Sequence, residues 1–373
     1  MQNTLYLVAP NNAESGTLET LPHNAAIKII KNDELLNSDI QFKPNDKVCV
    51  ASEASLEIAT SKLQDESKKN AVEVLKDKFK FREICSTIYP NYEFKKVDFA
   101  DIPNLKITKK TVLKPLKGCF GTAVKIVDPN TNLKRIAKEV QEELDKNSGV
   151  LSESVLSQND FLLEDYITGE EYAVDMFYDA DGIPHIVNIY HHPMPKIASY
   201  LHMIYYSSKE VFDLIYEEAI AFFKKLNTIL KLKNFTLHSE FKYDDILFPI
   251  EINAMRYGGM GLGNMLYHSL GIDPYHCFLN GKGPDWERIW SKNGDTIFAF
   301  FIAYNGTGID KTRMEPDLSL LKSKFTEVLH SAIFDYKNQL VFGIYSLKEN
   351  KENLEKLLAI EFNDYFKPIV NTV

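Results

Sequence analysis

The sequence predicts a mixed fold, α/β at its start and α+β further on, and three features lead to this expectation. Short apolar runs at residues 5–9 and 47–51 are typical of buried strands in a small α/β opening segment. Residues 161–192 hold several strand-like runs close together, which indicates a sheet-rich middle. Residues 235–252 alternate apolar and polar side chains around the turn sequence Tyr243-Asp-Asp, which predicts an antiparallel hairpin.

The composition is that of an ordinary globular protein. The chain has 373 residues, 45% hydrophobic and 25% charged, and this length is sufficient for two or three domains. A formal net charge of -9 argues against a surface for nucleic acid or for an anionic membrane, because both select basic surfaces. We therefore expect neither nucleic acid nor a membrane among the partners.

The cysteines and the N-terminal residues indicate a cytoplasmic protein. The four cysteines are scattered and form no Cys-x-x-Cys pair, so neither a zinc knuckle nor a disulfide framework is expected. Residues 1–10 lack the basic start of a signal peptide and are typical of a first strand. The longest other apolar run, at residues 297–304, is too short to span a bilayer.

The other elements follow from periodicity and from terminator residues. A helix is expected over residues 55–63, and a charged helix over residues 69–88 ends at Tyr89-Pro90-Asn91. A helix over residues 211–232 has apolar positions at helical spacing and is expected to pack under the hairpin. The remaining expected elements are strands at residues 94–97, 111–114, 161–166, 172–178 and 183–192, a helix at 133–144, and, after residue 294, strands followed by a helix at 353–366.

The hairpin carries the most informative polar residues. Glu240, Glu251 and Asn253 can face one way on its two strands, and two carboxylates with an amide oxygen form a ligand set that suits Mg²⁺. The alternative for any single glutamate here is a solvated strand face.

A second anion site is expected beside these acids. Arg256 follows the metal-binding residues closely, and a cation there can neutralise an anion next to the metal. Gly258 and Gly259 let backbone N–H groups approach that anion, and this glycine run is expected to close around a substrate carboxylate; a flexible turn is the alternative. The combination predicts phosphoryl or acyl-phosphate chemistry.

Two further segments indicate a nucleotide site. Lys114 ends a strand and precedes a loop with Gly118 and Gly121 that can fold over phosphates, although no Walker signature completes it and an ordinary hairpin turn is the alternative. In the second segment, the strand that delivers Glu164 continues into backbone that can pair with a purine edge. Glu171 after the next turn can bind ribose hydroxyls, the alternative being an edge hairpin with an acidic tip.

Three histidines lie near the expected site. His191 and His192 end a strand that should run beside the phosphates, and His238 precedes Glu240 on its own strand. Each is a candidate for substrate contact or for a base, and hydrogen-bonded structural histidines are the alternative.

Taken in order, these motifs resemble those of the ATP-grasp superfamily. The resemblance is to its carboxylate-amine ligase branch, which includes D-alanine-D-alanine ligase and carbamoyl-phosphate synthase. The resemblance covers roughly residues 70–279 and rests on Asp77-Lys78, on Lys114 with its glycine loop, on residues 164–171, and on the Glu251-x-Asn253 pattern followed by Arg256. Met255 lengthens the usual Glu-x-Asn-x-Arg pattern by one residue.

The resemblance implies an ATP site with divided roles. Lys78 and Lys114 would contact the phosphates under a lid formed by the loop from Gly118 to Gly121. The adenine and ribose residues implied are Glu164, Tyr166, Ile167 and Glu171.

It also implies a metal and substrate site. The implied ligands of Mg²⁺, with Mn²⁺ as a second candidate, are Glu240, Glu251 and Asn253. Arg256 and Lys114 would act on the reacting groups, and the expected substrate residues are Gly258, Gly259, His191 and His192.

The expected organisation is an ATP-grasp fold in three parts. These are a small N-terminal α/β domain at residues 1–75, an ATP-grasp domain at 76–290 with a lid subdomain at about 108–165, and a C-terminal α+β subdomain at 291–373 for substrate or homodimer contacts.

The expected function is that of an ATP-dependent ligase. It would activate a small carboxylate, an amino acid or short peptide, as an acyl phosphate for attack by an amine, with release of ADP and phosphate. The alternatives are a bicarbonate-activating enzyme of the carboxylase or carbamoyl type, and an ATP-binding sensor without turnover.

Overall fold

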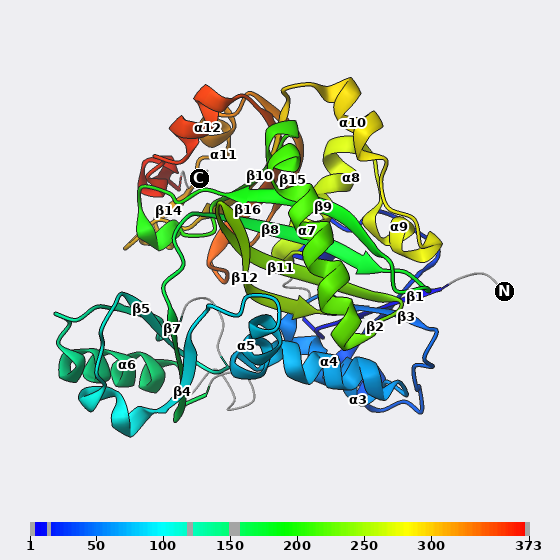
Figure 1. The fold of residues 1–373 in the computed structure, drawn as a ribbon. Coiled ribbons are helices and arrows are strands. Elements are labelled where there is room, and N and C mark those ends of the chain that lie inside the picture. Colours follow the sequence, from blue (N-terminus) through cyan, green and yellow to red (C-terminus); the bar gives the residue numbers. More distant parts are fainter. Residues whose placement is uncertain (1–3, 13–15, 118–121, 149–156, 370–373) are drawn as a thin grey trace. The chain divides into compact units, whose positions relative to one another are not determined.

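In the computed structural model the chain forms two compact units (Figure 1). Unit 1 comprises residues 1–69, 170–227 and 231–373, and unit 2 comprises residues 70–169 and 228–230. The structure describes residues 4–12, 16–117, 122–148 and 157–369.

Unit 1 begins with a three-stranded parallel sheet in the order β2-β1-β3. The central strand β1 (Leu5–Ala9) is almost wholly buried, and it pairs in parallel with β2 (Ile27–Lys31) and β3 (Lys47–Val50). Its neighbouring helices are α1 (Gly16–Glu19), α2 (Asn32–Leu36) and α3 (Leu56–Ser61). The strands expected at residues 5–9 and 47–51 are confirmed, whereas β2 and α2 were not predicted.

The main sheet of unit 1 has eight antiparallel strands in the order β12-β11-β8-β9-β10-β13-β16-β15. The predicted hairpin is confirmed as β11 and β12, with the turn at Asp245 in a left-handed conformation (φ 60°). In chain order the strands are β8 (Glu170–Tyr178), β9 (Pro184–His192), β10 (Ile204–Ser207), β11 (Phe235–Asp244), β12 (Ile246–Ala254), β13 (Ile297–Tyr304), β15 (Glu327–Ile333) and β16 (Val341–Glu349).

Helix α7 (Lys209–Leu230) covers one face of this sheet (Figure 1). The rings of Phe222 and Phe223 contact Phe241 of β11 edge to face, and the Tyr178 hydroxyl of β8 donates to the Phe223 carbonyl at 2.8 Å. Because successive side chains of a strand point to opposite faces, the neighbours of Phe241 and Tyr178 along each strand point away from α7. The predicted packing of this helix under the hairpin is confirmed.

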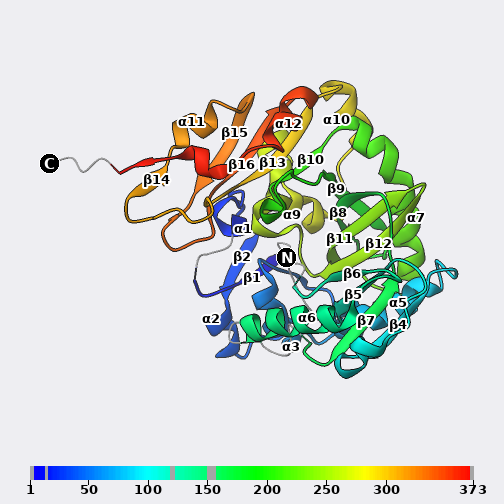
Figure 2. The same ribbon diagram turned by 90° about the vertical axis from the view of Figure 1, so that its left-hand side faces the viewer.

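The C-terminal residues extend the same sheet. Figure 2 shows β13, β15 and β16 with α12 (Lys351–Leu357) beside them, and an apolar cluster that includes Phe301, Leu347 and Leu354 joins these elements. The other elements here are α8 (Met265–Leu270), α9 (Pro274–Asn280), α10 (Trp286–Asn293), α11 (Leu318–Lys322) and the strand pair β14 (Met314–Pro316) and β17 (Phe366–Pro368).

Unit 2 is a four-stranded antiparallel sheet in the order β4-β7-β5-β6. Its apolar core contains Leu113, Val140 and Phe161, to which α6 contributes one amphipathic face. The elements are α5 (Lys78–Ser86), β4 (Phe94–Asp98), β5 (Thr111–Pro115), β6 (Lys125–Val127), α6 (Leu133–Ser148) and β7 (Asp160–Asp165).

The single helix expected over residues 69–88 is wrong in one respect, because two helices occupy this segment. Helix α4 (Glu66–Lys76) ends before Asp77, whose carboxylate accepts hydrogen bonds from the backbone N–H groups of Phe79 and Lys80 at 2.9 and 3.1 Å. This N-cap starts the new helix α5 at Lys78.

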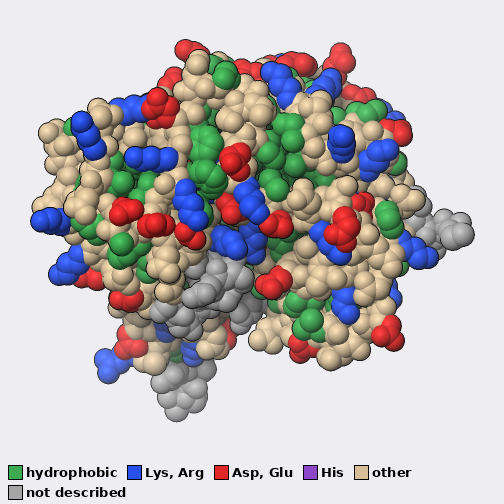
Figure 3. Space-filling model, turned by 60° about the horizontal axis from the view of Figure 1, so that its bottom comes forward, with side chains coloured by type: hydrophobic (Ala, Val, Ile, Leu, Met, Phe, Trp, Pro, Cys, Tyr) green, Lys and Arg blue, Asp and Glu red, His purple; other side chains and the backbone are tan. Residues whose placement is uncertain are grey.

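The described surface has mixed charge, and none of the described helices is both long and apolar enough to cross a membrane. On the face drawn in Figure 3, acidic and basic side chains lie interspersed.

Candidate active site

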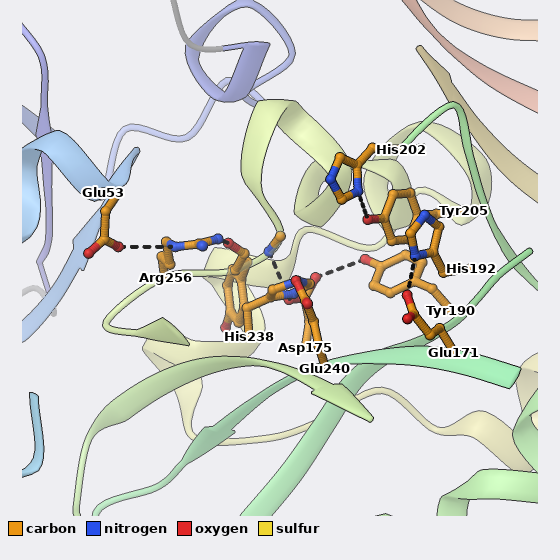
Figure 4. Close-up of polar contacts among 12 residues, drawn as sticks. Glu53, Glu171, Asp175, Tyr190, His192, His202, Tyr205, His238, Glu240 and Arg256 are labelled. Carbon is orange, nitrogen blue, oxygen red and sulfur yellow. Dashed lines mark hydrogen bonds and ion pairs between the residues drawn. The ribbon is translucent and has the colours of Figure 1, made fainter. Parts of the chain in front are cut away.

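Ionisable side chains gather on the face of the eight-stranded sheet that strand alternation turns away from α7. Figure 4 shows several of them close together. In the β11–β12 register Glu240 lies opposite Glu251, and His238 lies opposite Asn253. On the other side of β11, Asp175 of β8 lies opposite His238. Directly opposed residues of antiparallel strands share a face, so the structure brings together the three predicted metal ligands.

The two glutamates of this group suit a bound cation. Loss of hydration and the negative charge of Glu251 raise the pKa of Glu240, although 43% of the Glu240 side chain stays accessible to solvent. A cation would relieve this repulsion, and two carboxylates with the Asn253 amide oxygen are hard ligands of the kind Mg²⁺ takes. Over the described residues, no three side chains of Asp, Glu, His or Cys form a metal-binding group, and the proposed set needs only two.

Asp175 links this face to the turn that follows β12. Its side chain is 0% exposed, and its Oδ1 accepts hydrogen bonds from His238 Nδ1 and from the backbone N–H of Gly258, each at 2.8 Å. Its Oδ2 accepts from the Tyr190 hydroxyl at 2.8 Å. Figure 4 shows these contacts converging on one carboxylate.

Met255, the additional residue before Arg256, is absorbed by a left-handed backbone conformation with φ 60°. Its N–H donates to the Thr236 carbonyl at 2.8 Å and its own carbonyl accepts from the Val50 N–H at 2.7 Å. Its side chain is buried. The residue therefore forms a fixed corner between β12 and Arg256.

Arg256 and Gly259 lie close to each other. Arg256 Nη1 donates to the Tyr257 carbonyl at 3.2 Å, and Nε lies 4.0 Å from a carboxylate oxygen of Glu53. Gly259 is exposed, and a Cβ atom added there would lie 3.7 Å from Arg256 Nη1. A substrate anion beside Gly259 would therefore meet the guanidinium.

Glu171 lies on the same face and already has two cationic or imidazole partners. Its carboxylate contacts His192 Nδ1 at 3.1 Å and Lys242 Nζ at 3.4 Å. Burial alone would raise the pKa of Glu171, but His192 and Lys242 lower it. The His192 ring stacks on Tyr205 with centroids 4.1 Å apart (Figure 4).

The two adjacent histidines point to opposite faces of the sheet. His191 Nδ1 lies 2.7 Å from the Tyr206 hydroxyl, and its ring stacks on Tyr172 at 4.8 Å. Strand alternation separates it from His192, so only His192 shares a face with Glu171 and Glu240.

Unit 2 contains a buried ion cluster around Glu164. This carboxylate, 4% exposed, lies 2.6 Å from Arg82 Nε and 2.5 Å from Lys114 Nζ. Burial would raise the pKa of Glu164, but Arg82 and Lys114 lower it to about 2. Burial lowers the pKa of Lys114 to about 8, against the attraction of Glu164. Two cations around one anion leave a net positive charge.

Lys78 lies near this cluster, since its charge also disfavours protonation of Lys114. Its backbone N–H donates to the Leu116 carbonyl at 3.2 Å, which joins the start of α5 to the end of β5. The structure thus brings Lys78 and Lys114 together. Gly118 and Gly121 lie outside the described residues.

The predicted adenine segment follows β7 directly. Tyr166 and Ile167 are half-buried, and the Tyr166 N–H donates to the Lys110 carbonyl at 3.4 Å. Lys110 Nζ lies 3.8 Å from the centre of the Tyr166 ring. Gly169 has φ 96°, which fits the predicted turn.

Two residues of these clusters were missed in the sequence. Arg82 lies one helical turn after Lys78, and Asp175 is the single charge in the otherwise apolar run from Tyr172 to Tyr178. A charge at a position that periodicity assigns to the interior was the available signal.

Comparison with protein families agrees with this geometry. Residues 107–264 match the family model of the ATP-grasp domain. A search of curated proteins found no matching sequence. The family match confirms the resemblance seen in the motifs.

Solved structures of the same fold span almost the whole chain. L-amino acid ligase from Bacillus licheniformis superposes with a TM-score of 0.67 at 18% identity over 100% of both chains. Phosphoribosylglycinamide synthetase from Anaerococcus prevotii gives a TM-score of 0.56 at 15% identity, over 99% of this chain and 100% of that one. Carboxyaminoimidazole ribonucleotide synthase from Aspergillus clavatus, complexed with ATP, gives 0.61 at 13% over 98% of both. These matches confirm the predicted mixed fold.

Proposed function

We propose that the protein is an ATP-dependent carboxylate-amine ligase, because residues 107–264 match the family model of the ATP-grasp domain. It activates a small carboxylate, an amino acid or a short peptide, as an acyl phosphate that an amine then attacks. The observation that carries this proposal is the opposed pair Glu240 and Glu251 with Arg256 two residues after the end of the hairpin, because these groups suit a metal, a polyphosphate and a carboxylate. The L-amino acid ligase of similar fold supports an amino-acid substrate.

The reaction has two steps whose atoms balance. A carboxylate oxygen attacks the γ-phosphorus of ATP, the bond to the β-phosphate oxygen breaks, and ADP leaves. The amine nitrogen then attacks the acyl carbon, phosphate leaves with the oxygen that linked it, and the nitrogen loses a proton. Neither step needs a side-chain nucleophile, so catalysis consists of positioning and charge neutralisation.

The residues of unit 2 are proposed to bind the nucleotide. Lys78 and Lys114 would meet the phosphates, and the excess positive charge of the Arg82–Glu164–Lys114 cluster favours a polyanion there. The proposed adenine residues are Glu164, Tyr166 and Ile167, with Gly118 and Gly121 over the phosphates. Two cations already hold the Glu164 carboxylate, so in place of a direct contact with adenine we propose that Glu164 acts on ATP by positioning Lys114.

The residues of unit 1 are proposed to bind metal, ribose and substrate. Mg²⁺, or Mn²⁺ in its place, would neutralise phosphate charge when held by Glu240, Glu251 and Asn253. Arg256, Gly258 and Gly259 would hold the carboxylate and the acyl phosphate. Glu171 would receive the ribose hydroxyls in exchange for its contacts with His192 and Lys242, and His192 is a better candidate for substrate contact than His191.

The cellular location and the partners of the enzyme are a separate proposal. We infer a cytoplasmic protein that works on small molecules, from its scattered cysteines and its acidic net charge. The C-terminal strands are proposed to provide homodimer contacts.

The test is ADP release from Mg-ATP across pairs of amino acids and dipeptides. We expect release that requires both an acid and an amine and that EDTA abolishes. Glu251→Gln should lower kcat about 100-fold or more, whereas Glu327→Gln, an exposed glutamate on β15 of the same sheet, should leave it unchanged. Release that depends on bicarbonate alone would favour the carboxylase alternative, and ATP binding with no release for any acid would favour the sensor.

A further inference from the structure

Asp175 is a carboxylate in the interior of unit 1 whose partners come from three different places. Tyr190 belongs to β9, His238 to β11, and Gly258 to the turn after β12, and each donor lies 2.8 Å from a carboxylate oxygen. Burial of an ionised carboxylate is costly, and three donors are the compensation that such a group requires. An apolar side chain would fill this space without that cost, so the carboxylate calls for a role beyond packing.

The contacts of Asp175 determine which way His238 presents its ring. A carboxylate only accepts hydrogen bonds, so the hydrogen in this contact belongs to His238 Nδ1. In the neutral ring the lone pair then lies on Nε2, which is 3.8 Å from Glu240 Oε1. This distance is too long for a direct hydrogen bond, so Nε2 remains able to accept one from a third group near Glu240.

The same carboxylate holds the turn that carries Arg256. The Gly258 N–H donates to Asp175, and a Cβ atom on Gly258 would lie 2.9 Å from the Leu262 side chain, so the turn is tightly packed on both sides. Arg256 lies two residues before this anchor. Asp175 therefore contacts both the imidazole beside the glutamate pair and the turn beside the guanidinium.

We propose that Asp175 is a positioning residue of the reaction centre, which directs His238 Nε2 to accept a hydrogen bond from the attacking amine and fixes the turn of Arg256. The inference rests on the proposed ligase function and deepens it. It makes His238 the residue that orients the amine, with Asp175 acting through His238 and Gly258.

A double-mutant cycle tests the coupling. Asp175→Asn keeps the size of the side chain but loses the carboxylate charge that holds the hydrogen on His238 Nδ1, and His238→Gln removes the ring. Each should lower kcat about 10–100-fold, and the double variant should be no slower than the slower single one, because both remove the same interaction. The KM for ATP should stay within about twofold. Multiplicative effects of the two substitutions would overturn the proposal.

Two controls separate positioning from stability. Tyr190→Phe removes one donor to Asp175 without touching His238, so it should lower Tm as Asp175→Asn does while kcat falls much less. Asp181→Asn, an exposed residue of the β8–β9 turn, should change neither quantity. If Tyr190→Phe and Asp175→Asn lose kcat equally, the carboxylate is only structural.

The tautomer of His238 provides a readout that does not depend on activity. In ¹⁵N-histidine spectra, the signals that vanish in His238→Gln should show Nδ1 protonated, and Asp175→Asn should shift them toward the other tautomer. A wild-type Nε2–H tautomer would overturn the inference even in an active ligase. A protein that releases no ADP would instead contradict the proposed function and leave this spectrum to decide the geometry.

Discussion

Lys114 is the residue of the Arg82–Glu164–Lys114 cluster whose charge changes within an accessible pH range. Burial lowers its pKa to about 8, while Glu164 and Arg82 stay ionised around it. If Lys114 contacts the phosphates, ATP should bind best when the lysine is protonated. We therefore expect the Kd for ATP to rise above pH 8, by up to about tenfold per pH unit until the pKa of the complex is reached.

Calorimetric titration of ATP between pH 7 and 9.5 measures this dependence. Lys114→Arg keeps its charge over the whole range and should remove the rise of the Kd above pH 8. Lys138→Arg, on the exposed face of α6, should retain this rise.

Folding stability should increase with pH over the range in which ATP binding weakens. The unfolded lysine has an ordinary pKa of about 10.5 and binds more protons between pH 8 and 10.5, so stability rises with pH in that window. If the Kd for ATP depends on pH equally in the wild type and in Lys114→Arg, Lys114 does not contact the phosphates.

Single residues could be recognised in the sequence where they belong to a motif. Residues that stand out only because they are buried were missed. Lys114 and Glu251 could be singled out as candidates because Lys114 precedes a glycine loop and Glu251 lies on a hairpin opposite Glu240. Arg82 and Asp175 were missed because the only signal for each is one charge at a position that periodicity assigns to the interior, and this signal does not name the partner of the charge. Their partners, Glu164 and His238, lie 82 and 63 residues away, and such pairing needs the tertiary fold.

Helix α5 is the element that places Lys78 and Arg82 one turn apart, and its start depends on Asp77. The Asp77 carboxylate accepts from two backbone N–H groups of the first turn. Asp77→Ala should destabilise α5 by about 1 kcal/mol, whereas Asp77→Asn, an equally good N-cap, should cost a few tenths. Hydrogen exchange of the α5 amides should accordingly be about fivefold faster in the alanine variant.

The Kd for ATP distinguishes a local effect on Lys78 from a general loss of stability. Fraying of the first turn displaces Lys78, so Asp77→Ala should raise the Kd for ATP while Asp77→Asn leaves it near the wild-type value. An alanine variant with faster exchange in α5 and unchanged ATP affinity would show that Lys78 is not a phosphate ligand.

Elements were predictable where local chemistry determines them. The hairpin β11–β12 and the helix α7 follow from periodicity and turn residues, and both are present. The break at Asp77 was missed because helical periodicity continues through it, although an aspartate before a basic, aromatic turn is a start signal. Strands β2 and β10 were missed because each depends on its neighbours in the sheet for its pairing.

At the scale of the whole molecule, the eight-stranded sheet joins the candidate active site to the C-terminal residues. Strand β13 pairs with β10 on one side and β16 on the other, and Phe301 at its centre is 0% exposed. Its ring lies within 5.1 Å of Phe325 and 5.9 Å of Phe362, measured between centroids. If the sheet unfolds as one cooperative structure, loss of packing here should destabilise strands on the far side that carry Asp175 and Glu240.

Phe301→Ala tests this continuity against an independent C-terminal subdomain at residues 291–373. Removal of a fully buried ring should cost about 3–5 kcal/mol, whereas Leu340→Ala, 85% exposed, should cost almost nothing. Hydrogen exchange followed strand by strand should show β8 and β11 losing protection together with β13 and β16, because an antiparallel sheet that loses a central strand loses its ladder on both sides. Faster exchange confined to β13, β15 and β16 would instead support a C-terminal subdomain that opens by itself. The strands of the candidate active site would then belong to a separate cooperative unit, with its boundary between β10 and β13.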